Sequence, residues 1–348
     1  GLVVIIGVII LVPFFLRFSS LPSGGGISAG SGQESGKEII LSVDEGENWQ
    51  EAGKAEVNPA LAGKSGVKKE RFPSKISGIF FHPREPETVF LGTKQAGLWK
   101  SLNGGKSWQR VQDKNKVLKN NSDVYKLALS RSNPKIMYAA VYQDNRGRIL
   151  QSKDGGESFQ EIYFINVPKV AVFDVWIDPA NPNKVLIATG QGGILETQNG
   201  GGTWRVKKWF GYPLWKLVGS PFSSFEAYLV TGQDQFFKTF DGGDEWENFT
   251  ENISKAWIKT QASNSMEPGD IFAPPAGYLR PVGPNLRIAL QTLATDPNAF
   301  NILYMGIPNT LLRSYDGGVS WSGVTTPIPP KESPIASVAI SPRSSALI

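Results

Sequence analysis

Three charged residues are the side chains in this sequence whose types and spacing best suit chemistry. Lys126, Asp174 and Lys216 each stand at the same place near the beginning of an apolar, strand-like segment. Two ammonium groups and one carboxylate at one site would bind a small polar or anionic ligand. The alternative is an ordinary salt bridge that lines the interior of the fold. Tyr125 and Trp215 immediately precede two of these residues and would add aromatic surface to such a site.

Few other side chains suit catalysis or metal binding. The 348 residues include no Cys and only one His, His82, so thiol catalysis, Cys-based zinc sites and His relays are excluded. His82 precedes Pro at a turn where other segments carry Asp178, Ser220 or Asp296. We therefore interpret it as a turn residue. We expect no catalytic residue, no metal and no cofactor.

A turn motif that occurs six times marks the elements that would position these residues. It reads Ser/Thr-x-Asp/Asn-x-Gly-x-x-aromatic and begins at positions 42, 101, 152, 197, 239 and 314. Asp or Asn near Gly is typical of hairpin turns, because such turns need positive φ and the side chain can accept turn hydrogen bonds. We assign a structural role to the acidic or amide residues and the aromatic residues of the six copies: Asp44, Asn103, Asp154, Asn199, Asp241, Asp316, Trp49, Trp108, Phe159, Trp204, Trp246 and Trp321.

The sequence before each motif predicts the rest of a repeating unit. An apolar segment, a turn that often contains Pro and a second apolar segment precede it, as in residues 127–130, 133–134 and 136–141 before Ser152. This order predicts four-stranded antiparallel blades of an all-β propeller. The motif resembles the Asp-box, or BNR, repeat of sialidases, sortilin-type ectodomains, family 74 xyloglucanases and photosystem II stability/assembly factors. The resemblance implies a β-propeller over residues 38–348 and no particular activity, because those families share the repeat and not a chemistry.

The two ends of this region predict how the ring closes. The first motif has no inner strands before it, whereas residues 336–348 have inner strands and no motif. Joined, they would form one blade shared by N- and C-terminal strands, which leaves no sheet edge exposed. The prediction is a single six-bladed propeller. A seventh, degenerate blade between positions 239 and 314 is the alternative.

An apolar stretch precedes the propeller. Gly1–Leu16 contains no charged residue and Arg17 follows it. A membrane-spanning helix needs about 20 apolar residues and the core of a signal peptide about 7–15. We predict an N-terminal hydrophobic helix over residues 1–18, a transmembrane anchor or signal-anchor, with a cleaved signal peptide as the alternative. Residues 19–37 form a Gly/Ser-rich linker. We expect the propeller on the extracytoplasmic side of a bacterial membrane, in the periplasm or at the cell surface.

The enzymatic members of the resembling families imply residues that this sequence lacks. A sialidase would need a substrate-binding arginine triad and an Arg-Ile-Pro motif, which is absent. A family 74 glycosidase would need two opposed carboxylates, and only Asp174 occupies the inner position of its segment. We therefore expect a protein that is not an enzyme. A glycoside hydrolase or a carbohydrate-binding protein of the sialidase or xyloglucanase type is the alternative.

An insertion at about 251–287 is the best candidate for a partner surface. Long insertions in compact folds are often binding loops, and aromatic and Arg side chains are enriched at protein interfaces. Packing over the ring is the alternative. We predict a membrane-tethered binding or assembly module with a protein partner, or a glycan as the alternative, and no nucleic acid, since no basic groove with interleaved aromatics is apparent. The insertion contributes Trp257, Phe272, Tyr278, Arg280 and Arg287.

Overall fold

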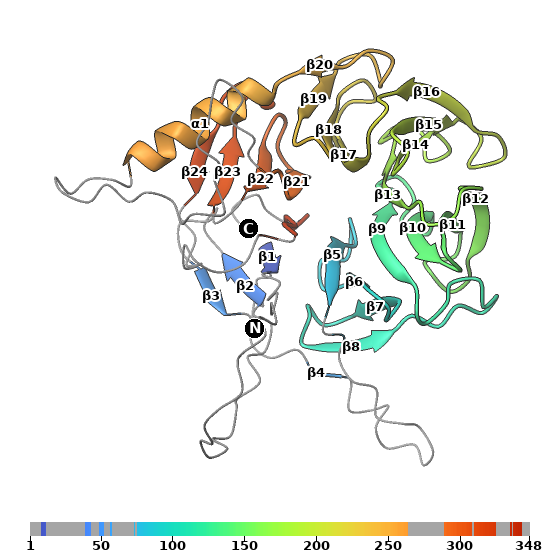
Figure 1. The fold of residues 1–348 in the computed structure, drawn as a ribbon. Coiled ribbons are helices and arrows are strands. Elements are labelled where there is room, and N and C mark those ends of the chain that lie inside the picture. Colours follow the sequence, from blue (N-terminus) through green and yellow to red (C-terminus); the bar gives the residue numbers. More distant parts are fainter. Residues whose placement is uncertain are drawn as a thin grey trace, which may run out of the picture.

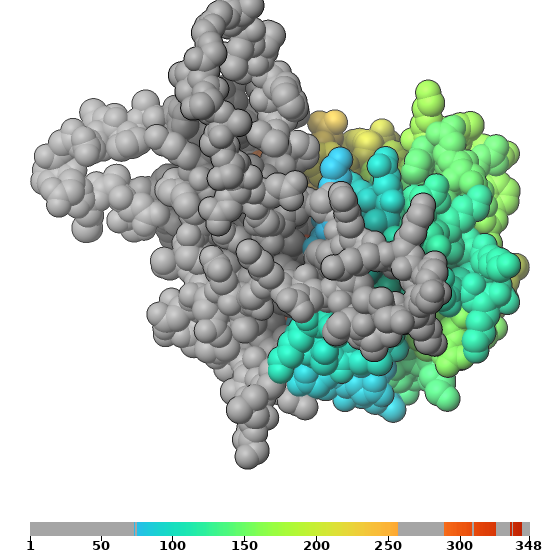
Figure 2. Space-filling view, turned by 90° about the horizontal axis from the view of Figure 1, so that it is seen from below, coloured from blue at the N-terminus to red at the C-terminus, as the bar shows by residue number. Residues whose placement is uncertain are grey.

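The protein is a β-propeller whose blades surround a central axis (Figure 1). The computed structural model describes residues 8–11, 39–42, 49–51, 56–57, 73, 75–263, 289–307, 310–324, 335 and 337–342, with backbone only before residue 58 and from 257 to 263. Each blade is an antiparallel sheet whose first strand lies nearest the axis and whose fourth strand lies outermost. In the side view, the blades coloured cyan to green form one continuous body (Figure 2).

Five four-stranded blades follow one another along the chain. Blade 1 contains β5 (Ile76–Phe81), β6 (Val89–Thr93), β7 (Leu98–Ser101) and β8 (Ser107–Arg110); blade 2 contains β9 (Asp123–Leu129), β10 (Met137–Gln143), β11 (Arg146–Ser152) and β12 (Gln160–Phe164). Blade 3 contains β13 (Val172–Ile177), β14 (Val185–Thr189), β15 (Gly193–Thr197) and β16 (Arg205–Trp209); blade 4 contains β17 (Leu214–Gly219), β18 (Ala227–Thr231), β19 (Phe236–Thr239) and β20 (Glu247–Asn248). Blade 5 contains β21 (Thr292–Thr295), β22 (Leu303–Ile307), β23 (Thr310–Ser314) and β24 (Ser322–Val324). The short β4 (Glu56–Val57) adds a parallel strand outside β8.

The second strand of each blade forms the core. Every residue of β6, β14, β18 and β22 is buried. These strands are nearly continuous apolar runs because neighbouring blades cover both of their faces. The aromatic residue of the turn motif adds to this core: Phe159, which is 1% exposed, packs with Phe90 and Leu98 of blade 1.

The predicted number of six blades, or seven, is wrong. The two ends do not combine into a four-stranded blade, because β2 (Ile39–Ser42) pairs with β1 (Val8–Leu11) and β3 (Trp49–Glu51) in a three-stranded sheet. Figure 1 shows this sheet between blade 5 and blade 1. The C-terminal segment forms no strand in its described part, yet it fills the same gap: Ile335 and Ile340 pack against blade 5, and Ala339 packs against blade 1.

The predicted N-terminal helix is not shown. Of residues 1–18 the structure describes only β1, which pairs Ile9 with Leu41 and Ile10 with Ile40. An apolar stretch can satisfy its backbone in a sheet as well as in a helix, and this partner strand is equally apolar. In the described ranges, no helix has both the length and the apolar character needed to span a membrane. Membrane anchoring stays a prediction.

The turn motif stabilises both itself and the neighbouring turn. Ser152 Oγ accepts hydrogen bonds from the amides of Asp154 (3.3 Å) and Gly156 (2.9 Å) and donates one to the Asp154 carboxylate (2.7 Å). That carboxylate accepts the Ser158 amide at 2.9 Å, and the same pattern recurs in the four other described copies. The Gly155 amide donates to Lys135 O (3.0 Å) in the turn between the first two strands of the blade. The motif therefore joins two turns on one face of the propeller.

Replacing Asp154 tests this structural role. We expect Asp154→Ala to lower the free energy of unfolding by about 1–2 kcal/mol, as the loss of a capping side chain does. Asp154→Asn should cost less, because Asn103 and Asn199 occupy the equivalent position in two other copies. Urea denaturation would compare the three proteins, and an Ala variant as stable as the wild type would contradict the assignment.

The charge of the Asp154 carboxylate should also make the free energy of unfolding depend on pH. Burial is the largest influence on the pKa of Asp154 and raises it, but hydrogen bonds from Ser158 and Ser152 outweigh it and bring the pKa to about 2. A carboxyl group whose pKa is depressed by folding stabilises the fold above its unfolded pKa of about 3.9 and loses that contribution as the pH falls towards about 2. The advantage of the wild type over Asp154→Asn should therefore be full at pH 7 and vanish near pH 2 in equilibrium unfolding.

Candidate functional site

A cavity of about 270 Å³ lies on the axis of the propeller. The innermost strands β5, β9, β17 and β21 and the C-terminal segment line it. Its lining includes Gly78, Lys126, Lys216, Thr292 and Ser337, which hold corresponding positions near the start of successive innermost segments. The repeat therefore brings residues far apart in sequence to one place.

A β-bulge precedes this position in each of the first four blades. The pairing register of β5, β9, β13 and β17 shifts at one residue, so that Ser77, Tyr125, Phe173 and Trp215 each lack a partner on the second strand. Strict alternation would place Tyr125 and Lys126 on opposite faces of the sheet. The bulge interrupts that alternation, and both residues line the cavity. Bulges re-aim side chains in this way and are common beside functional sites.

The predicted charged residues come together at this level. Lys126 Nζ lies 3.3 Å from Asp174 Oδ1, and the Asp174 side chain is 1% exposed. Asp174 is also held by the backbone: its Oδ1 accepts the Val175 amide (2.8 Å) and its Oδ2 accepts the Leu217 amide (3.2 Å) from blade 4. Asp174 thus joins blades 2, 3 and 4 around the axis.

Electrostatics couple Lys216 to the same carboxylate. Desolvation lowers the pKa of Lys216, Asp174 raises it and Lys126 lowers it, and the net effect is a lowered pKa. Burial also raises the pKa of Tyr125 to about 12, with further contributions from Asp123. Tyr125 contacts Phe173 edge-on, with 5.2 Å between ring centroids, so aromatic surface borders the cluster on the side of blades 2 and 3.

The sequence analysis missed Arg131, which bounds the other end of the cavity. Its guanidinium donates to Pro297 O (2.8 Å) of blade 5 and lies over the ring of Phe222. Arg84 of blade 1 in turn donates to Ser132 O (2.7 Å). These contacts connect the turns of several blades where the innermost strands end. No sequence signal distinguishes Arg131 from other turn residues, because its contacts cross between non-adjacent blades.

The chemistry of the cavity is that of a cationic binding site. Its described lining contains Lys126, Lys216 and Arg131 and no carboxylate. Asp174 beside the cavity already accepts two backbone amides and the Lys126 ammonium, and the buried Asp296 stands between Thr295 and Pro297, which line the cavity. Glycosidic hydrolysis by the usual route requires two carboxyl groups, and the described residues that line this cavity supply no such pair.

The remaining predicted residues are placed as follows. Trp215 is 42% exposed at the start of β17 and does not line the cavity. His82 is a turn residue, as predicted, since its Nδ1 accepts the Glu85 amide at 2.9 Å. The insertion begins as helix α1 (Thr250–Ser263), which was not predicted from the sequence. Its residues Ile253 and Ala256 pack against the core that includes Trp321. The Trp257 side chain lies outside the described residues, as do Phe272, Tyr278, Arg280 and Arg287.

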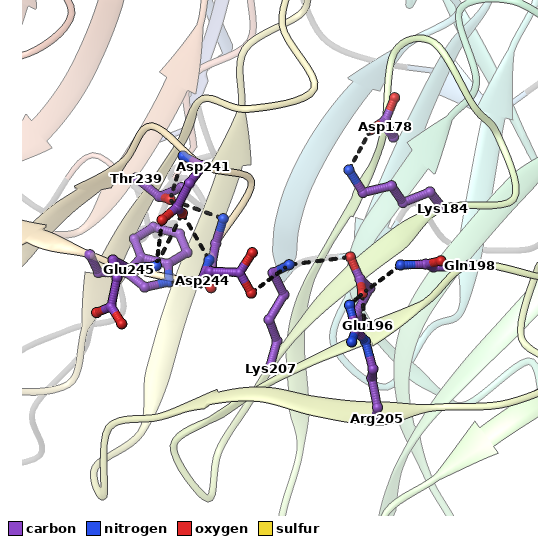
Figure 3. Close-up of polar contacts among 12 residues, drawn as sticks. Asp178, Lys184, Glu196, Gln198, Arg205, Lys207, Thr239, Asp241, Asp244 and Glu245 are labelled. Atoms are coloured by element: carbon purple, nitrogen blue, oxygen red, sulfur yellow. Dashed lines mark hydrogen bonds and ion pairs between the residues drawn. The ribbon is translucent and has the colours of Figure 1, made fainter.

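A second cluster of charges lies between blades 3 and 4 (Figure 3). Lys207 is 6% exposed and bridges Glu196 (3.6 Å) to Asp244 (3.0 Å), while Arg205 binds the other oxygen of Glu196 at 2.5 Å. Within this close-up Arg205 and Lys207 bind Glu196, and turn amides bind the Asp241 carboxylate. The cluster joins two blades, and among the described residues no group of His, Cys, Asp and Glu is arranged to hold a metal ion.

Comparison with known proteins identifies the fold. No family model matches this sequence, and no curated protein matches it. Similar solved structures include a nidogen/laminin complex, at 13% identity over 96% of this chain and 98% of that chain with a TM-score of 0.57. A GH74 xyloglucanase from Xanthomonas campestris matches at 13% identity over 78% and 50%, with a TM-score of 0.50, and YCF48 bound to D1 peptide matches at 17% identity over 72% and 82%, with a TM-score of only 0.44.

The chain matches only part of each GH74 enzyme, and at low sequence identity. The chain spans 31%, 45% and 50% of the length of three GH74 enzymes that it resembles in structure. At such low sequence identity the likeness concerns the fold alone. The Asp-box and sortilin-type resemblance stays a prediction. The comparisons therefore show a β-propeller fold, shared with the nidogen/laminin complex and a GH74 xyloglucanase.

Proposed function

We propose that this chain is a protein-binding or assembly module and that its partner docks on the face where the blades are connected to one another. The observation that carries the proposal is a pair of exposed tryptophans on that face. Trp209 ends β16 and is 54% exposed, and Trp215 is 42% exposed six residues later. We call these two residues the aromatic rim.

The aromatic rim stands at a connection rich in aromatic residues. Two aromatic residues of the connection between blades 3 and 4, Phe210 and Tyr212, are in ring contact (6.1 Å between centroids), and Trp209 and Trp215 lie on the strands on either side of it. Phe210 also packs against Phe237 and Trp246 and anchors the connection to blade 4. The two tryptophans remain outside this anchor. Exposed apolar patches mark interaction sites, and Trp is enriched among residues that dominate binding energy.

We propose that the predicted insertion belongs to the same partner surface. Its described part, α1, follows β20, as residues 210–213 follow β16, so both begin where an outermost strand ends. The aromatic and Arg side chains predicted for the insertion lie outside the described residues, and their part in the partner surface stays a proposal. The described lining of the axial cavity carries cations, which suit binding of a partner group or ligand.

Capture from native membranes tests the proposal. The full chain would be used as bait beside the double variant Trp209→Ala/Trp215→Ala and a control, Phe225→Ala. Phe225 is 63% exposed in a turn near the motif on the opposite face. We expect specific partners to be reduced at least about tenfold by the double variant, as for the loss of interface hot spots, and to be retained by the control. Equal recovery by all three baits would contradict the proposal.

We also propose that residues 1–18 tether the propeller to a membrane from the extracytoplasmic side. The uncharged stretch Gly1–Leu16 and the Gly/Ser-rich residues that follow it support this proposal. The full chain should stay with membranes after alkaline carbonate extraction, and a variant without residues 1–18 should be released. Release of the full chain would contradict tethering and would favour the pairing of Val8–Leu11 in β1 as its role.

A further inference from the structure

We propose that the axial cavity binds a small organic anion, a carboxylate on an apolar body. The proposal rests on the cavity and not on the aromatic rim, so it goes beyond the protein-binding function. Two features carry it: an excess of positive charge over negative charge in the lining, and donors near the polar end that the described protein leaves unused.

The charge balance is clear. Three cations, Lys126, Lys216 and Arg131, line the cavity, and its described lining holds no acid. Asp174, behind the lining, offsets one positive charge and already accepts two backbone amides and the Lys126 ammonium. Arg131 is exposed to solvent, so the cost of an uncompensated charge falls on the lysines at the other end of the cavity, and a bound anion would reduce it.

Unused donors lie around the beginning of the innermost strands. Lys216 makes no hydrogen bond or ion pair with another described residue. Its ammonium interacts electrostatically with the charges of Asp174 and Lys126. Thr292 and Ser337 line the same cavity, and among the described residues neither hydroxyl group has a hydrogen-bond partner. One ammonium and two hydroxyl groups can therefore donate to a ligand.

The walls of the cavity select the rest of the ligand. Apolar residues of four innermost strands and of the C-terminal segment line the rest of the cavity: Ile79, Leu127, Val218, Leu293 and Val338. Arg131 closes the opposite end through its bond to Pro297. Phosphate is best held by Arg forks or several backbone amides, and the guanidinium of Arg131 already donates to Pro297 O. A small apolar body with one carboxylate fits this arrangement better than phosphate does.

Lys216 provides a spectroscopic reporter of occupancy. Burial lowers its pKa in the free protein, and Asp174 is the only group that raises it. A bound carboxylate would act in the same direction as Asp174. Measuring the Lys216 ammonium by NMR in the wild-type chain should show a higher pKa when ligand is present.

The test uses hexanoate as the probe, hexanamide as its neutral counterpart and inorganic phosphate as a second anion. Calorimetry on the full chain should detect hexanoate binding and neither of the others. Lys216→Met should weaken that binding at least about tenfold, and Lys169→Met, an exposed lysine outside the cavity lining, should leave it unchanged. If Lys216→Met fails to fold, the wild type provides the test: the pKa of Lys216 should rise when hexanoate is added, and an unchanged pKa would contradict the site.

The contrary outcomes are equally specific. Absence of hexanoate binding, equal binding of hexanamide, binding of phosphate alone, or a Lys216→Met variant that binds like the wild type would each overturn the carboxylate site. The capture experiment on the aromatic rim does not involve these residues. Failure of one proposal is therefore distinguishable from failure of the other.

Discussion

Gly147→Ala is expected to destabilise the propeller by about 3 kcal/mol or more, at the upper end for an added methyl group. A Cβ at this position would lie 2.4 Å from Val172 N, 2.7 Å from Ala171 C and 2.8 Å from Ala171 Cα. All three atoms are backbone, so no side-chain rotation can relieve the overlap. Blade 2 would have to move away from blade 3.

That movement would also break hydrogen bonds. The Gly147 amide donates to Val170 O at 2.8 Å, and Gly147 O accepts the Ile165 amide at 2.9 Å. Both bonds fix the connection between the two blades. Because the blades pack through buried strands on both sides, the loss should lower the stability of the whole ring and not only of one loop.

Gly155→Ala is the matched control. A Cβ at Gly155 would meet no atom within 4 Å, so its cost is limited to the positive φ of 80° and should be about 1 kcal/mol. Urea denaturation of the two variants separates close packing between blades from local backbone strain. A Gly147→Ala protein no less stable than Gly155→Ala would show that the two blades do not approach as described.

Asp174→Ala is expected to cost about 3–5 kcal/mol, as does removal of one member of a buried ion pair. Asp174 accepts amides from blades 3 and 4 and neutralises Lys126. Its loss leaves two backbone donors without their acceptor and two lysine side chains facing each other. Asp174→Asn keeps an acceptor of the same size and should be less destabilising.

The destabilisation should depend on pH through Lys216. A lysine whose pKa is lowered by folding destabilises the fold at pH values where it is charged, and this cost disappears as the pH rises to its unfolded pKa of about 10.4. Since Asp174 raises the pKa of Lys216, its removal enlarges the cost. The stability difference between the wild type and Asp174→Ala should therefore be larger at pH 7 than at pH 10. A difference that grows with pH would contradict the coupling.

The blade pattern was predictable because it is local. The turn residues from Ser152 to Phe159 satisfy one another within eight positions, and the same contacts recur in each described copy. The number of blades was not predictable, because it depends on which distant strand pairs with Ile39–Ser42. Apolar composition at Val8–Leu11 suits a membrane helix and a sheet strand alike, so the pairing could not be inferred from it.

The candidate site was only partly predictable from the sequence. The repeat register was enough to group Lys126, Asp174 and Lys216, because equivalent positions on innermost strands face one axis. The bulges at Tyr125 and Trp215 leave no mark in the hydrophobic pattern, and they decide where neighbouring side chains point. The role of Arg131 depends on a contact 166 residues away in sequence. Such contacts appear only when the ring is assembled.

The most direct test of the proposed function is the position of cross-links between the full chain and its captured partner. Exposed lysines mark both faces: Lys119 and Lys169 lie in connections between blades, and Lys106, Lys135 and Lys153 lie in or beside the turns of the motif. If the aromatic rim forms the partner surface, mass spectrometry should find the cross-links on the first set. Cross-links confined to the second set would contradict the account and place the partner on the opposite face.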